Sequence, residues 1–126
     1  MIGRILGPIA IAALLAAWPA AAQNRNTPSE LADMQCIAVF SLTSAEESLT
    51  EEQQNGLAMG LIYYLGRLQG QAPAVDWYQR LTAYLLDLDW KGLEPHFERC
   101  ASDFEAEGLR LEAWGASLSR KAEGKS

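Results

Sequence analysis

Hydrophobic residues recur along this chain at intervals of three and four, the spacing that brings side chains onto one face of an α-helix. The first such series carries an apolar stripe at Leu31, Met34, Ala38 and Leu42. Thr27, Pro28 and Glu30 open it, in the order of an N-cap, a first-turn proline and the acidic residue of a capping box. The pattern predicts a first helix from Pro28 to about Leu42.

A second helix is predicted from a capping box at Thr50 and Gln53, and it should extend to about Gln69. Its main apolar stripe is Leu57, Leu61, Leu65 and Leu68. Small and aromatic residues and one arginine share the opposite face: Gly56, Gly60, Tyr63, Tyr64 and Arg67. A helix that is small or apolar nearly all round is either buried centrally or meets partners on two sides.

The third and last helical segments follow a turn in which Gly70 is well placed to end the second helix. Asp76 can cap a third helix, with Gln79 as its partner, and its apolar series is Trp77, Leu81, Tyr84, Leu85 and Leu88. Glu94-Pro95 restarts a helix with a long apolar series: Phe97, Cys100, Ala101, Phe104, Gly108, Leu111, Gly115 and Leu118. The sequence leaves open whether residues 95–121 form one bent helix or two.

No window of the chain shows the alternation that is typical of a β-strand. We therefore expect an all-α fold, a compact bundle of four to five helices.

Residues 1–22 have the features of a cleaved export signal. Arg4 supplies the positive start, an apolar run follows to Ala17, and three alanines at residues 20–22 suit signal peptidase. The alternative is a retained anchor, but the apolar core is short for about 30 Å of hydrocarbon. Residues 23–126 are then a single helical domain with short disordered ends. We expect a periplasmic or secreted location and no stable membrane span after cleavage.

Cys36 and Cys100 are the only two cysteines in the sequence. In an exported chain, two thiols allow a single intramolecular disulfide, which would join the first and the last helices. Two buried free thiols and a redox-active pair are the alternatives. A catalytic dithiol is usually a CxxC motif, and this chain has none.

The acidic charge and the scarcity of special residues limit the chemistry of the chain. The formal net charge is −6 and becomes −7 when Arg4 leaves with the signal, which disfavours a nucleic-acid partner. His96, the single histidine, follows Glu94-Pro95 in an acidic turn, where a surface position is the ordinary expectation. We therefore expect no enzyme activity, no catalytic residue, no metal site and no cofactor.

The face formed by Gly56, Gly60, Tyr63, Tyr64 and Arg67 is the candidate interaction face. Its glycines permit close approach of a neighbouring backbone, so the face serves either tight internal packing or contact with another protein or a second copy. Among the many aromatic residues, Tyr78 and Trp90 are the two that the pattern leaves exposed.

Several short segments of the chain carry a resemblance: Met34-Gln35-Cys36, residues 60–67, Arg99-Cys100, Gly108 and residues 115–118. Together they resemble the small exported two-cysteine helical proteins of Gram-negative bacteria. The chain is also similar, more weakly, to the periplasmic acid-stress chaperones, which join an early helix to a late one by one disulfide. Two functions follow as expectations: a non-catalytic binding protein of unknown partner, and an acid-responsive chaperone.

Overall fold

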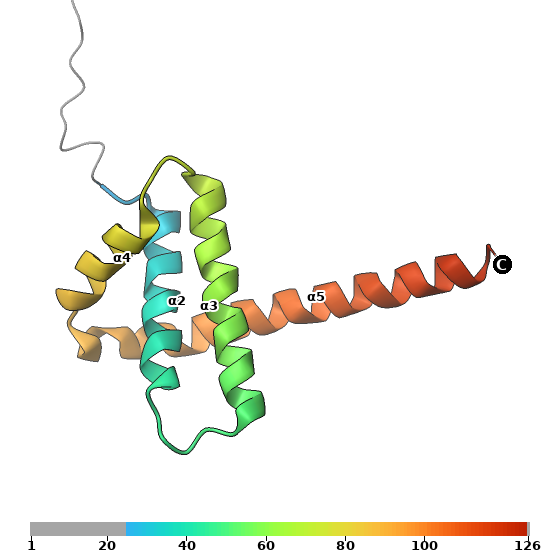
Figure 1. Cartoon of the computed structure of the whole chain (residues 1–126), viewed down its shortest axis with the longest axis horizontal. Coiled ribbons are helices and arrows are strands. Elements are labelled where there is room, and N and C mark those ends of the chain that lie inside the picture. The colour runs from blue at the N-terminus through green and yellow to red at the C-terminus, as the bar shows by residue number, and fades with distance from the viewer. Residues whose placement is uncertain (1–24, 126) are drawn as a thin grey trace, which may run out of the picture.

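The computed structural model describes residues 25–125. The regular secondary structure of these residues is entirely helical, with no strand among them (Figure 1). The elements are the α-helices α2 (Pro28–Ser44), α3 (Glu51–Gln71), α4 (Trp77–Leu86) and α5 (Phe97–Glu123), and the short 3-10 helix η1 (Trp90–His96). The all-α prediction is confirmed. The predicted export signal, residues 1–22, lies outside the described residues.

The predicted N-terminal caps are confirmed at three helices. The Thr27 hydroxyl accepts from the Glu30 backbone amide at 3.1 Å, and the Glu30 carboxylate accepts from the Thr27 amide at 3.3 Å. Thr50 and Gln53 form the same reciprocal pair at the start of α3. The Asp76 carboxylate caps α4 by accepting from the Gln79 amide. Each cap satisfies backbone donors that a helix start otherwise leaves unpaired.

α2 is the central element of the bundle, whereas the sequence offered a central position for the second predicted helix as one of two alternatives. α3 lies along one side of α2 and α4 along the other, while η1 and the first turns of α5 cross behind them (Figure 1). Five consecutive residues of α2, from Cys36 to Phe40, are therefore buried. In α3 only Gly60, Tyr64 and Leu68 are buried, because a single face of this helix meets α2.

Cys36 in the middle of α2 and Cys100 in the first turn of α5 form a disulfide, with the two Cα atoms 5.3 Å apart. Both cysteines are fully buried. The Tyr64 hydroxyl donates to the Cys100 carbonyl oxygen at 2.8 Å, so α3 is tied to the same point. The prediction that one disulfide joins the first and last of the described helices is confirmed.

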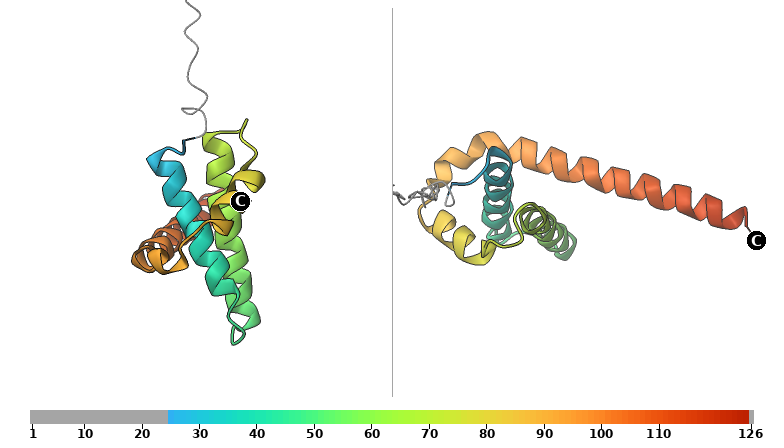
Figure 2. Two further views of the ribbon diagram at one scale, coloured as in Figure 1. Left: turned by 90° about the vertical axis from the view of Figure 1, so that its left-hand side faces the viewer. Right: turned by 90° about the horizontal axis from the view of Figure 1, so that it is seen from above.

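Residues 97–123 form one continuous helix, which settles the alternative that the sequence left open. The helix also continues past Lys121, where we expected a disordered end, and α3 continues one residue past Gly70. Only the first turns of α5 touch the bundle, and its C-terminal half projects away from it (Figures 1 and 2). No helix within residues 25–125 is long and apolar enough to cross a membrane.

Candidate interaction surfaces

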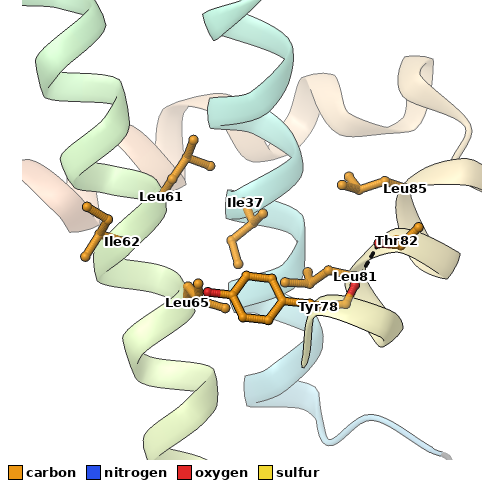
Figure 3. Close-up of a pocket in the computed structure, with 8 residues that line it drawn as sticks. All are labelled: Ile37, Leu61, Ile62, Leu65, Tyr78, Leu81, Thr82 and Leu85. Carbon is orange, nitrogen blue, oxygen red and sulfur yellow. Dashed lines mark hydrogen bonds between the residues drawn. The ribbon is translucent and has the colours of Figure 1, made fainter. Parts of the chain in front are cut away.

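An apolar groove with a volume of about 290 Å³ lies between α3 and α4, above α2 (Figure 3). Its lining residues are Ile37 of α2, Leu61, Ile62 and Leu65 of α3, and Tyr78, Leu81, Thr82 and Leu85 of α4. Ile37 and Leu81 are buried core residues, whereas Ile62 and Tyr78 are 70% and 67% exposed. The groove is thus an opening of the hydrophobic core to the surface, with exposed apolar side chains at its edges.

The groove contains few groups that can form hydrogen bonds. The Thr82 hydroxyl donates to the Tyr78 backbone carbonyl at 2.7 Å, so this donor is already used (Figure 3). The phenol of Tyr78 reaches from α4 toward Leu65, and it is the other side-chain polar group of the lining (Figure 3). Recognition in this groove therefore depends on apolar contact.

Two ion pairs hold the walls of this region to α2. Buried Asp33 accepts from Arg67 Nε at 3.2 Å and from Gln71 Nε2 at 2.8 Å, which fixes α3. Glu30, also buried, lies 3.9 Å from the Arg80 guanidinium of α4. The hydrogen bond to Tyr63 and the charge of Asp33 raise the pKa of Arg67, so the guanidinium keeps its charge. Both carboxylates therefore act in positioning helices.

Two of the five residues of the candidate interaction face, Gly60 and Tyr64, are buried by the chain's own helices. Phe40 of α2 covers Gly60, and Tyr64 is buried between α2 and α5. Tyr63 is half-buried and packs against Phe104, while Arg67 binds Asp33. Of the two glycines on this face, Gly56 is the one whose Cβ position has open space around it. Gly60 therefore serves internal packing, which was one of the two roles that the sequence allowed for this face.

Burial raises the pKa of Tyr64 to about 12, with a smaller contribution from the charge of Asp103. The phenol therefore stays protonated near neutral pH and donates its hydrogen bond to the Cys100 carbonyl oxygen. This interaction is structural, because the atoms involved are buried and paired.

His96 closes η1 next to α5 and is half-buried. Within residues 25–125, no three side chains of His, Cys, Asp or Glu come together in a way that could hold a metal ion. In the same part of the chain, every buried side-chain nitrogen or oxygen has a hydrogen-bond partner.

Tyr78 and Trp90 are exposed, as the sequence predicted, at 67% and 39%. Trp114 on α5 is also exposed, at 62%, although the pattern had not singled it out as exposed. A second groove, of about 270 Å³, lies between α3 and the base of α5 and is lined by Met59, Ile62, Tyr63, Phe104, Glu107, Gly108 and Leu111. Ile62 lines both grooves, and Met59, which the sequence pattern had assigned to no stripe, lines the second.

Comparison of the chain with protein-family models, with curated proteins and with solved structures finds no match. The function is therefore argued from the surfaces described above.

Proposed function

We propose that this protein is a non-catalytic helical interaction protein of the periplasm or the extracellular space, which binds an apolar helix of a partner protein. The α3–α4 groove carries this proposal, because it opens the core to the surface between two helices. A groove with this form accommodates a third helix, whose apolar side chains would lie on Ile37 and Leu81. A polar metabolite would find few hydrogen-bonding groups there.

The size of the groove limits the affinity that it can give. Burial of an aliphatic side chain such as Ile62 or Leu85 contributes about 1.5–3 kcal/mol. Association costs about 4–15 kcal/mol in lost translational and rotational freedom. Four or five well-packed side chains therefore give a modest affinity, which suits a reversible complex.

The disulfide supports the proposed location. Cys36 and Cys100 are paired in the folded protein, and disulfides of this structural kind persist in oxidising compartments. The export signal expected at residues 1–22 leads to the same compartment.

Site-specific photo-crosslinking in cells tests the groove directly. A photoreactive amino acid replaces Tyr78 at the edge of the groove, and the neighbouring exposed Gln79 serves as the control position. We expect discrete adducts from position 78 and none from position 79.

A charged variant with a matched control makes the test specific. Thr82→Glu places a carboxylate in the apolar lining and should abolish the adducts, whereas Ala83→Glu adds the same charge at an exposed position outside the lining. Absence of adducts at position 78, or adducts that persist in Thr82→Glu, would contradict the proposal.

An acid-responsive chaperone is the second candidate, and the ion pairs favour it. Carboxylates in general are neutral in strong acid. Loss of the Asp33–Arg67 and Glu30–Arg80 ion pairs would release α3 and α4 from α2, while the disulfide would keep the chain compact. With Arg4 removed, nine Lys and Arg residues plus His96 would give a net charge of about +10 at low pH. Self-repulsion would then loosen the fold and expose the groove.

The assay for this candidate is suppression of client aggregation at about pH 2–3, compared with pH 7. We expect protection in acid alone, together with binding of a hydrophobic dye. Equal protection at both pH values, or none in acid, would contradict the chaperone function.

A further inference from the structure

The C-terminal half of α5 carries large apolar side chains that no other helix of residues 25–125 covers. It extends beyond the other helices (Figures 1 and 2), and Leu111, Trp114 and Leu118 are 62%, 62% and 51% exposed. An isolated helix of this length is marginally stable in water. The exposed stripe therefore needs a second surface to cover it.

The stripe alternates large and small residues in a heptad pattern. Phe104, Leu111 and Leu118 recur every seven residues, and Gly108, Gly115 and Ala122 do the same between them. Among residues 25–125, nothing lies within 4 Å of a Cβ position at Gly108 or Gly115. The packing of these described residues thus does not require the two glycines, although glycine is unfavourable inside a helix.

Two copies of this helix fit one another when they run antiparallel. Stripe residues that are equally far from position 113 in the sequence then lie opposite each other. Each large residue thereby meets a small one: Phe104 with Ala122, Gly108 with Leu118, and Leu111 with Gly115. A parallel pair would instead set leucine against leucine and leave gaps at the glycines. A two-fold axis makes this contact self-complementary.

The charges on the flank of the stripe agree with the same arrangement. On the flank that contains Trp114, residues equally far from Trp114 face each other. The antiparallel pair therefore brings Glu107, which also contacts Arg110 of its own helix at 2.9 Å, beside Lys121 of the second copy twice. The two Trp114 rings meet near the axis. On the other flank Glu112 faces its own copy, which weakens the pairing without changing its register. A parallel pair would instead bring Glu107 beside Glu112 of the second copy, which places like charges together.

The groove at the base of α5 receives the end of the second helix. In this register Leu118 of the second copy lies at Gly108, against the exposed side chains of Met59 and Ile62 on α3. The second helix therefore covers apolar surface on α3 as well as on α5. Since this groove lies on the other side of Ile62 from the α3–α4 groove, the contact does not rest on the proposed function.

We propose that the protein forms a symmetric homodimer in which the projecting halves of α5 pair antiparallel and end in the α3–α5 grooves. Sedimentation equilibrium of the purified exported protein tests it, with Gly115→Leu as the blocking variant. Ala113→Leu, on the opposite side of the helix, is the matched control. We expect a dimer for the unmodified protein and for Ala113→Leu, and at least tenfold weaker dimerisation for Gly115→Leu.

A charge exchange tests the register. Glu107→Lys and Lys121→Glu should each weaken the homodimer, whereas a mixture of the two variants should form a heterodimer, because both pairs between residues 107 and 121 are then of opposite charge. Far-UV circular dichroism confirms that each variant keeps its helix. A monomer at all concentrations, a dimer that is indifferent to Gly115→Leu, or no preference in the mixture would each overturn the proposal.

Discussion

Gly60→Ala tests how α2 and α3 pack, because a Cβ atom at this position would lie 2.9–3.1 Å from three ring carbons of Phe40. That ring cannot move freely, since it is buried and contacts Tyr64 and Phe104 at centroid distances of 5.7 and 5.6 Å. The alanine therefore forces the ring or the two helices apart.

The magnitude is the balance of two effects. Alanine stabilises a helix interior by about 1 kcal/mol relative to glycine. Overpacking a core typically costs about 1–3 kcal/mol. At Gly56 and Gly66 of the same helix nothing lies within 4 Å of the Cβ position, so alanine there should show the gain alone. We expect Gly60→Ala to be about 1–3 kcal/mol less stable than Gly66→Ala.

Urea denaturation of the three alanine variants measures these differences, provided that the denaturant slope is unchanged. Phe40→Leu supplies a further check, because removing the ring should shrink the penalty of alanine at residue 60. If Gly60→Ala gained as much stability as Gly66→Ala, or if its penalty were unchanged in the Phe40→Leu background, the proposed contact would not be the cause.

Two further predictions concern the disulfide and its neighbouring tyrosine. Cys36→Ser and Cys100→Ser should each lower the free energy of unfolding by up to about 4 kcal/mol. The double variant should lose little more, because either change opens the same loop. Clearly unequal losses of the two single variants in urea denaturation would argue against this. Tyr64 has a folded-state pKa of about 12 against an ordinary value of 10.0, so its contribution is complete below pH 10 and is lost as the pH rises through 12. Between pH 10 and 12, the free energy of unfolding of Tyr64→Phe should therefore fall by roughly 2–3 kcal/mol less than that of the unmodified protein. Identical pH curves for the two proteins would show that Tyr64 does not have this raised pKa.

The sequence predicted most of the fold because the signals for its helices are local. The caps at Thr27, Thr50 and Asp76 use residues only three positions away, and the helical period is visible within each segment. Contacts between residues that are far apart in the sequence could not be predicted from these local signals. Asp33 and Arg67 are 34 residues apart, and Tyr64 and Cys100 are 36 apart, so nothing in the local pattern predicts either contact.

The candidate site was predicted only in part. Tyr78 was expected to be exposed, and it is, but the groove beside it exists because α3 and α4 diverge over Ile37. The glycine face of the second predicted helix had two interpretations in the sequence. The position of Phe40 decided between them, since its ring fills the space that Gly60 leaves.

By itself, the sequence determined the helical class, the helix starts and the pairing of its only two cysteines, because these depend on local hydrogen bonds, periodicity and count. Only the tertiary structure decided which helix is central and how much of α5 is covered. Two adjacent helices span about 20 Å at ordinary packing distances. The 27 residues of α5 extend about 40 Å. The C-terminal half of α5 therefore extends beyond the other described helices, although its apolar pattern continues.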